Sequence, residues 1–258
     1  MIRARESKSA PIGVVTRVLK ILEALHGAPR GLDLKGIAQA TAINKSTAYR
    51  ILAHLESEGY LFRESAGAYF IGPRLVRLAS ATNHHTVLRE VSRPILHQLW
   101  RGTAETVNLA VPDGDEVLYV DVIESPHSFR LVSHPGMRRP MYCTALGKSI
   151  MAYFPAGQRE KLLSSFPPQR YTPRTLCRPA QLRKELTKIR QRGFAVDDQE
   201  ATLGARCVGA PVFGESGKVI AAVSISGPTT RIGKKQVPAL GAKVTGAARA
   251  ISARLVVK

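Results

Sequence analysis

Residues 32–63 read LDLKGIAQATAINKSTAYRILAHLESEGYLFR, and this stretch decides the fold of the first part of the chain. Within it, residues 34–41 predict a short helix, and Asn44 is placed to cap a second helix over residues 45–58. Gly59 follows at a position where a glycine commonly ends a helix. The second helix carries one apolar stripe at the spacing i, i+3, i+4 and i+7, formed by Ala48, Ile51, Leu52 and Leu55.

The residues on either side add a helix before this pair and a hairpin after it. Apolar residues recur at helical spacing over residues 14–25. Two apolar, aromatic runs at 60–62 and 68–71 flank a glycine-containing turn, which predicts a β-hairpin. Residues 13–72 are therefore predicted to form a winged helix-turn-helix, mostly α with a β-hairpin wing.

A winged helix-turn-helix places its second helix in the major groove of DNA. The apolar stripe fixes which side chains of that helix face outward. Arg50 suits bidentate pairing with guanine, and the residues at the helix N-terminus suit contacts with phosphates, which the helix dipole also favours. Arg63 on the wing is placed to contact the neighbouring backbone. The predicted DNA contacts are Lys45, Ser46, Thr47, Tyr49, Arg50 and Arg63.

Residues 1–12 are predicted to be a basic, flexible arm. Its Arg3, Arg5 and Lys8 suit the minor groove of DNA. The arm lacks the apolar segment of a signal peptide, and no apolar run in the chain approaches the ~20 residues that a membrane span needs. We therefore expect a cytoplasmic protein without a membrane partner.

The composition points to a polyanionic partner. The 258 residues include 38 Lys and Arg against 19 Asp and Glu, for a formal net charge of +19. Such a field speeds association with DNA or RNA; an anionic membrane surface, or no specific partner, is the alternative. The basic excess extends over both parts of the chain, so charge alone does not say which part meets a nucleic acid. The 44% of hydrophobic residues allows a packed core and excludes collagen-like and low-complexity chains.

The remainder of the chain predicts a second domain of a different class. Residues 73–101 are expected to form a helical linker, with the domain boundary near residues 80–85. Residues 102–258 alternate between predicted strands and helices, which favours an α+β domain with an antiparallel sheet flanked by helices. The expected strands lie at 106–111, 116–123, 129–133, 194–196, 207–213 and 219–226, and the expected helices at 144–154, 179–192 and 237–256.

Several polar groups of this domain suit a small anion. Residues 144–148, TALGK, lie where a loop enters a helix, and the free N–H groups there can hold a carboxylate. Ser224 and Ser226 share one face of a strand because side chains alternate along it. Asp197 and Cys207 lie on two further strands. The alternative is that the two serines only form the polar face of a strand.

The cysteines give little sign of catalysis or metal binding. Cys143, Cys177 and Cys207 form no C-x-x-C pair, so no zinc ribbon or finger is predicted. A catalytic cysteine usually needs a base such as histidine within reach, and no histidine lies in the motifs that contain Cys143 and Cys207. A zinc site built from these two thiols and a His or Asp stays open as an alternative. We predict no catalytic residue, no metal and no cofactor.

In their order and spacing, these motifs resemble the IclR family of bacterial transcriptional regulators. The resemblance covers residues from about 14 to 255. It rests on residues 32–63 and on YFIGPRL (69–75), CTALGKSIMAYF (143–154), RGFAVDDQE (192–200), GARCVGAPVF (204–213) and AAVSISGP (221–228). It implies a GAF-like effector domain over residues 102–258 that also oligomerises, dimers that often pair into tetramers, and control of catabolic genes by a small metabolite.

The resemblance also implies the residues of the effector site. Leu131, Met137 and Met141 would close the pocket and set its size. Leu146 is bulkier than its counterpart in some keto-acid sensors of the family, so the class of effector does not carry over. The implied ligand contacts are the amides of Ala145 and Leu146 and the side chains of Asp197, Cys207, Ser224 and Ser226.

The sequence thus predicts a regulator that binds double-stranded DNA at a pseudo-palindromic operator and senses a small organic acid. It is expected to act as a homodimer or homotetramer and to control a catabolic operon. One alternative is a nucleic-acid-binding protein whose C-terminal domain only oligomerises. A second is a metabolite-processing enzyme with a basic appendage. The sequence leaves open the effector, the operator, and whether the protein activates or represses.

Overall fold

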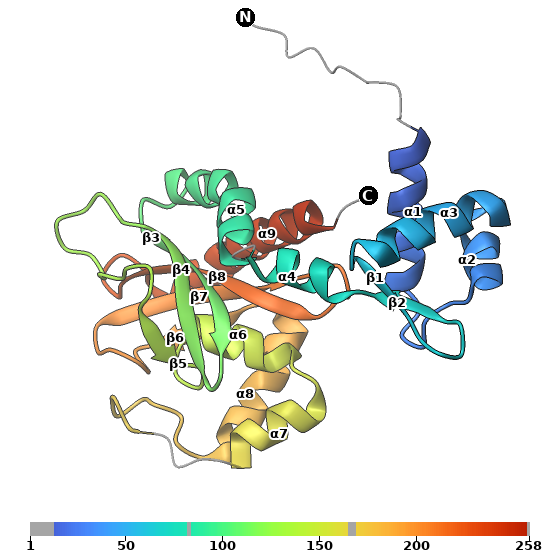
Figure 1. Ribbon diagram of the computed structural model, residues 1–258. Coiled ribbons are helices and arrows are strands. Elements are labelled where there is room, and N and C mark those ends of the chain that lie inside the picture. Colours follow the sequence, from blue (N-terminus) through green and yellow to red (C-terminus); the bar gives the residue numbers. More distant parts are fainter. Residues whose placement is uncertain (1–12, 82–83, 165–168, 257–258) are drawn as a thin grey trace, which may run out of the picture. The chain divides into compact units, whose positions relative to one another are not determined.

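The chain divides into two compact units, one up to Asn83 and one from His84. A computed structural model describes residues 13–81, 84–164 and 169–256 (Figure 1). The predicted basic arm, residues 1–12, lies outside the described residues. The boundary between the units falls inside the segment 73–101 that was predicted to link two domains.

The first unit is built on three helices whose ends are fixed by their caps. They are α1 (Gly13–His26), α2 (Leu34–Thr41) and α3 (Lys45–Ser57). The Asp33 carboxylate accepts a hydrogen bond of 2.7 Å from the Gly36 N–H at the start of α2, and Asn44 Oδ1 accepts one of 2.8 Å from the Thr47 N–H at the start of α3. Each cap satisfies a backbone donor that has no acceptor within its own helix.

The wing and a further helix complete this unit. Strand β1 (Leu61–Arg63) pairs antiparallel with β2 (Tyr69–Ile71), and α4 (Pro73–Ala81) follows. Gly59, between α3 and β1, has a φ of +72°, as expected for a glycine that ends a helix. The core of the unit is one cluster: Ile21, Leu25, Ile37, Ile43, Ala48, Leu52, Leu61 and Tyr69. The predicted winged helix-turn-helix is confirmed.

The second unit is a helix–sheet–helix sandwich. In the described residues its sheet has six strands in the order β5-β4-β3-β8-β7-β6, and all neighbours are antiparallel. The strands are β3 (Thr106–Asp113), β4 (Glu116–Ile123), β5 (Arg138–Pro140), β6 (Ala195–Asp198), β7 (Ala205–Phe213) and β8 (Val219–Pro228). The predicted α+β domain with an antiparallel sheet is confirmed.

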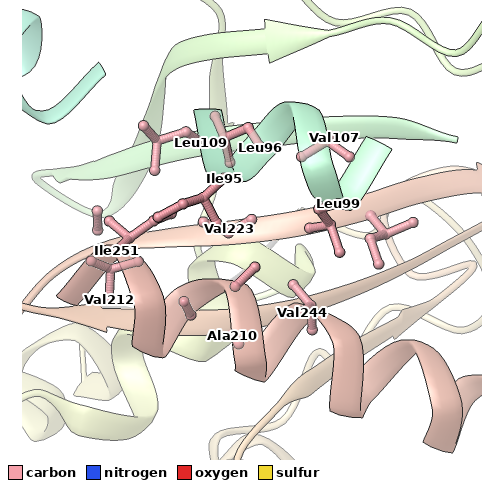
Figure 2. Close-up of a cluster of buried hydrophobic side chains, with 14 of the residues drawn as sticks. Ile95, Leu96, Leu99, Val107, Leu109, Ala210, Val212, Val223, Val244 and Ile251 are labelled. Carbon is pink, nitrogen blue, oxygen red and sulfur yellow. The ribbon is translucent and has the colours of Figure 1, made fainter. Parts of the chain in front are cut away.

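Helices cover both faces of this sheet (Figure 1). On one face lie α5 (His84–Arg101) and α9 (Val237–Leu255), the latter preceded by a short 3-10 turn at Lys234–Gln236. On the other lie α6 (Ala145–Tyr153), α7 (Ala156–Ser164) and α8 (Pro179–Arg192). Figure 2 shows the core on the first face, where Leu96 and Leu99 of α5 and Val244 and Ile251 of α9 pack against the sheet. Side chains alternate between the two faces of each strand, so the remaining strand residues face the side of the sheet that α6 covers.

Three short elements differ from the sequence prediction. Residues 129–133 were expected to form a strand, but they are irregular, and Phe129 and Val132 are 73% and 68% exposed. An alternating apolar pattern makes a strand only where one face packs on a core, and these side chains face solvent. The strand β5 and the helix α7 were not predicted. No helix in the described ranges is long and apolar enough to cross a membrane.

Candidate ligand pocket and nucleic-acid interface

The start of α6 lies directly on the sheet of the second unit. Gly209 of β7 makes this possible, because a Cβ at that position would come within 2.9 Å of the Ala145 carbonyl oxygen. Thr144 caps the helix, and its Oγ1 accepts a hydrogen bond of 3.1 Å from the Gly147 N–H. Within the described part of the chain, the backbone N–H groups of Ala145 and Leu146 donate no hydrogen bond. They are the donors that a first helical turn leaves free.

A cavity of about 90 Å³ opens at this helix end. Leu131 and Met137 also line it, as the family resemblance implied, but Met141 does not, because it is buried in the core between α6 and the sheet. All six predicted effector contacts line the cavity: Ala145, Leu146, Asp197, Cys207, Ser224 and Ser226.

The register of the sheet brings the side chains of the pocket floor together. Asp197 of β6 pairs with Cys207 of β7, which pairs with Ser226 of β8. Asn108 of β3 pairs with Ser224 on the other edge of β8. Residues directly opposite one another in an antiparallel sheet point to the same face, so all five side chains face α6.

Sequence reasoning missed Asn108, the residue that joins the two serines. Its Nδ2 donates hydrogen bonds to Ser224 Oγ (3.2 Å) and to Ser226 Oγ (3.1 Å), while Ser133 Oγ donates to its Oδ1 at 2.6 Å. The only signal in the sequence was that Asn108 and Thr106 are polar residues at alternate positions of an otherwise apolar strand. Its partners follow from the pairing of β3 with β8, which a single sequence does not reveal.

Two further lining residues were missed, and both have polar side chains. Arg139 on β5 is exposed and brings a positive charge to the rim. Tyr119 on β4 is buried, and burial raises the pKa of its phenol, with Cys207 and Asp197 adding to the effect. Since β5 itself was not predicted, nothing in the sequence placed Arg139 beside the serines.

Buried charges lie beneath the pocket. Lys148 of α6 is fully buried and forms an ion pair with Glu200; it also donates a hydrogen bond of 2.7 Å to the Val196 carbonyl. Asp197 Oδ1 accepts hydrogen bonds from the backbone N–H groups of Glu200 (2.7 Å) and Ala201 (3.3 Å). Burial raises the pKa of Asp197 to about 6, although Lys148 and these two N–H groups oppose the shift. Burial likewise raises the pKa of Glu200 to about 7, against the effect of Lys148.

The two thiols near the pocket are held in their neutral form. Burial raises the pKa of Cys143 to about 12 and also raises that of Cys207. A thiol must lose its proton to act as a nucleophile or as a zinc ligand. The described residues include no group of three or more His, Cys, Asp or Glu that is arranged to hold a metal ion.

In the first unit, α3 presents the predicted DNA contacts on its outer face. Lys45, Ser46, Tyr49 and Arg50 are exposed and Thr47 is half-buried, whereas Ala48 and Leu52 on the opposite face are buried. The Ser46 hydroxyl donates a hydrogen bond of 3.1 Å to Asn44 Oδ1, so it supports the helix cap. On the wing, the exposed Arg63 guanidinium lies 5.3 Å from the centre of the Tyr69 ring.

A hollow beside the start of α3 adds two basic residues that the sequence reading missed. Arg17 and Lys20 of α1 line it together with Asn44 and Thr47, and its volume is about 380 Å³. Arg17 and Lys20 are three positions apart on a helix, so they share one face. The spacing was readable, but not the fact that this face borders α3.

Comparisons with known proteins match both units of the chain. The model described as IclR helix-turn-helix domain matches residues 14–65, and the one described as bacterial transcriptional regulator IclR C-terminal matches residues 80–253. HTH-type transcriptional regulator BhcR of Paracoccus denitrificans is 35% identical over 245 residues, which cover 95% of this chain and 88% of that protein.

Solved structures show the same relationship. The crystal structure of IclR from Thermotoga maritima is 31% identical, with a TM-score of 0.64, over 95% of this chain and 99% of that chain. An IclR homologue from Microbacterium hydrocarbonoxydans, crystallised with 4-hydroxybenzoate, is 26% identical, with a TM-score of 0.62, over 94% of this chain and 98% of that chain. The family consists of transcriptional regulators rather than enzymes. The chain therefore belongs to the IclR family of bacterial transcriptional regulators, with a DNA-binding helix-turn-helix domain followed by an effector-binding domain.

Proposed function

We propose that this regulator senses a small organic acid in the pocket at the start of α6 and responds by changing its affinity for a pseudo-palindromic operator of a catabolic operon. The observation that carries the proposal is the set of donors around the cavity. The amides of Ala145 and Leu146, the hydroxyls of Ser224 and Ser226, and the guanidinium of Arg139 border one small space. A carboxylate needs several such donors to leave water.

The size of the pocket supports a small effector. At roughly 10–15 Å³ for each water molecule, a cavity of about 90 Å³ has room for several waters and so for a compact acid. The homologue crystallised with 4-hydroxybenzoate adds a precedent for an acid in a protein of this fold. A hydroxyl on such an acid has an acceptor in Asp197, whose Oδ2 has no hydrogen bond recorded among the described residues.

On the DNA side, α3 enters the major groove and the wing follows the backbone. Lys45, Ser46, Thr47, Tyr49 and Arg50 contact DNA from α3, and Arg63 contacts it from the wing. Arg17 and Lys20 bind a phosphate in the hollow beside α3, and the arm of residues 1–12 lies in the minor groove. Two heads of a homodimer, or of one half of a homotetramer, read the two half-sites of the operator. Such a regulator acts in the cytoplasm, where bacterial DNA lies.

Control by an effector requires the acid to bind more tightly when the heads are in one arrangement than in the other. By linkage, the acid then changes operator affinity by the same factor that the operator changes acid affinity, typically about 5–150-fold. The two heads and the two pockets are thus coupled without any direct contact between acid and DNA.

The test begins with a DNA site selected from a random library by the full-length protein. Operator affinity is then measured by fluorescence anisotropy with and without a panel of small keto, hydroxy and aromatic acids. We expect at least one acid to shift the wild-type affinity severalfold or more. The variant Ser224→Ala/Ser226→Ala should bind the operator normally and lose the response, because it removes roughly 1–3 kcal/mol for each charged hydrogen bond.

Two other outcomes would contradict the proposal. If no acid binds the wild type or shifts its operator affinity, the acid-sensing proposal is wrong, and a domain that only oligomerises becomes the better account. If the double variant responds like the wild type, the effector binds elsewhere. Val14→Ala/Val15→Ala on exposed positions of α1 serves as the matched control and should respond as the wild type does.

A further inference from the structure

The Asn108 side chain forms hydrogen bonds with three serines. It is 2% exposed, and its side chain offers two N–H donors and one carbonyl acceptor. Ser224 Oγ and Ser226 Oγ lie 3.2 and 3.1 Å from Nδ2, whereas Ser133 Oγ lies 2.6 Å from Oδ1. The longer distances are typical of N–H···O bonds and the shorter one of an O–H···O bond. The lengths therefore agree with the donor facing Ser224 and Ser226.

This orientation decides which way the serine protons point. Each of the two hydroxyl oxygens accepts a hydrogen from Asn108, so the hydroxyl's own proton is left for another acceptor. Both hydroxyls line the cavity, so a ligand atom there meets donors from the serines.

We propose that Asn108 is a positioning residue that orients the Ser224 and Ser226 hydroxyls as donors, so that the pocket selects carboxylates over ligands that offer N–H groups in their place. The inference rests on the proposed function and adds the residue that sets the polarity of the pocket. Ser133 completes the arrangement, because its bond to Oδ1 stops the amide from turning over. Ser133 belongs to the irregular segment between β4 and β5, which also reaches the sheet through a hydrogen bond of 3.1 Å from Thr106 Oγ1 to the Leu131 carbonyl.

The polarity can be tested without any ligand. The chain has only three asparagines, Asn44, Asn83 and Asn108, so labelling the full-length protein with 15N-asparagine gives three side-chain NH₂ signals. Loss of one signal each in Asn44→Asp and Asn83→Asp assigns the remaining signal to Asn108. We expect Ser224→Ala to shift one proton of the Asn108 NH₂ group and Ser226→Ala to shift the other. If Ser133→Ala shifts these protons and the other two variants do not, the amide faces the opposite way and the inference is overturned.

Selectivity is tested with acids and their primary amides as probes: acetate and acetamide, pyruvate and pyruvamide, benzoate and benzamide, and 4-hydroxybenzoate and 4-hydroxybenzamide. Calorimetry should show that the wild type prefers the acid. Asn108→Asp turns the serine protons toward the new carboxylate, so the preference should fall by roughly tenfold or more, about 1.4 kcal/mol for each factor of ten. The matched control Asp115→Asn, on an exposed turn, leaves Asn108 and its three serine partners unchanged and should keep the preference.

The outcomes separate this inference from the function on which it rests. A wild type that binds no acid, with the expected NH₂ shifts, refutes acid sensing and leaves the orientation of Asn108 standing. A wild type that prefers acids, with an unchanged preference in a folded Asn108→Asp variant, refutes the role of Asn108 and leaves acid sensing standing. The NH₂ shifts of the serine variants decide the question if Asn108→Asp does not fold.

Discussion

Asp197 is an acid among hydrogen-bond donors, and its ionisation sets the pH range in which the pocket accepts an anion. Burial raises its pKa to about 6, so the neutral form is common in mildly acidic solution. A neutral Asp197 does not repel a carboxylate and can donate to it, whereas an ionised Asp197 repels it. The charged and titratable groups that influence or border it are Lys148, Asp198, Glu200, Cys207, Tyr119 and Arg139.

We therefore predict that affinity for an anionic effector falls as pH rises through about 6, by up to tenfold for each pH unit above it, because binding must then take up a proton. Asp197→Asn should bind the same acid with an affinity that changes far less between pH 5 and pH 8. Calorimetry across this range is the measurement. Asp115→Asn, on an exposed turn, is the control and should keep the wild-type profile; a wild-type affinity that is flat with pH would contradict the prediction.

Arg50 is the side chain best placed to read a base. It is exposed on α3, one position before the half-buried Ile51 and two before the buried Leu52. Because its side chain takes no part in the core, Arg50→Ala should fold normally and lose ~1–3 kcal/mol of specific operator affinity. Anisotropy with the selected operator and with a scrambled duplex measures the loss. Lys184→Ala on α8 should lose nothing, and equal affinities for wild type and Arg50→Ala would remove Arg50 from the contacts that read bases.

At the scale of elements, a buried ion pair ties α6 to the segment after β6. Lys148 and Glu200 are both buried, and Glu200 Oε2 has no hydrogen-bond partner among the described residues. The desolvation of two charges offsets much of their attraction, so the pair contributes little net stability while both partners are present. Removing one partner leaves a buried charge alone, and that is costly.

Lys148→Met should accordingly lower the free energy of unfolding of the second unit by about 3–5 kcal/mol near pH 8. The loss should be smaller near pH 5. Without Lys148 the pKa of Glu200 rises further above its unfolded value, so the folded state binds the extra proton and loses stability as pH rises. Urea unfolding followed by Trp100 fluorescence measures this unit alone, because Trp100 of α5 is the only tryptophan. Adding Glu200→Gln to Lys148→Met should recover part of the lost free energy of unfolding. A loss in Lys148→Met that is greater at pH 5 than at pH 8 would contradict the argument.

Elements with a clear apolar pattern or a marked end were predictable from the sequence, and elements with neither were not. The structure has α2, α8 and β4 at the residues predicted for them, because each has a clear apolar period or a Gly or Pro at its end. Helix α7 buries only Leu163, so its sequence carries almost no periodic signal. Strand β5 has three residues, two of them exposed arginines, and depends on its pairing with β4.

The pocket was predictable to the extent that its residues lie in motifs. Ala145, Leu146, Asp197, Cys207, Ser224 and Ser226 all came from stretches that resemble the family, and the structure brings them to one cavity. Asn108, Ser133 and Arg139 come from β3, an irregular segment and β5. They reach the pocket only through long-range strand pairing and loop packing, and those are properties of the folded chain that no local pattern encodes.

At the scale of the whole molecule, the charge of +19 raises the question of which residues meet DNA. Each phosphate neutralised by a Lys or Arg contributes about −0.9 to the slope of log K against log salt. The slope therefore counts contacts, and it distinguishes a basic residue that binds DNA from one that only adds to the long-range field. Lys45 and Arg63 are exposed on the first unit, while Lys184 and Lys188 are exposed on α8 of the second and have no ion pair recorded in the described residues.

We predict that Lys45→Gln/Arg63→Gln makes the salt slope of operator binding less steep by about 3 to 4, since a dimer loses four phosphate contacts. Lys184→Gln/Lys188→Gln removes the same charge from the protein and should leave the slope unchanged. Any effect of these two charges should be confined to the lowest salt concentrations, because a charge that does not touch DNA acts through a field that ions screen. Anisotropy titrations between about 50 and 300 mM salt give both slopes. An equal flattening in the two variants would place the basic face of α8 on the DNA, and the second unit would then bind the operator as well as the effector.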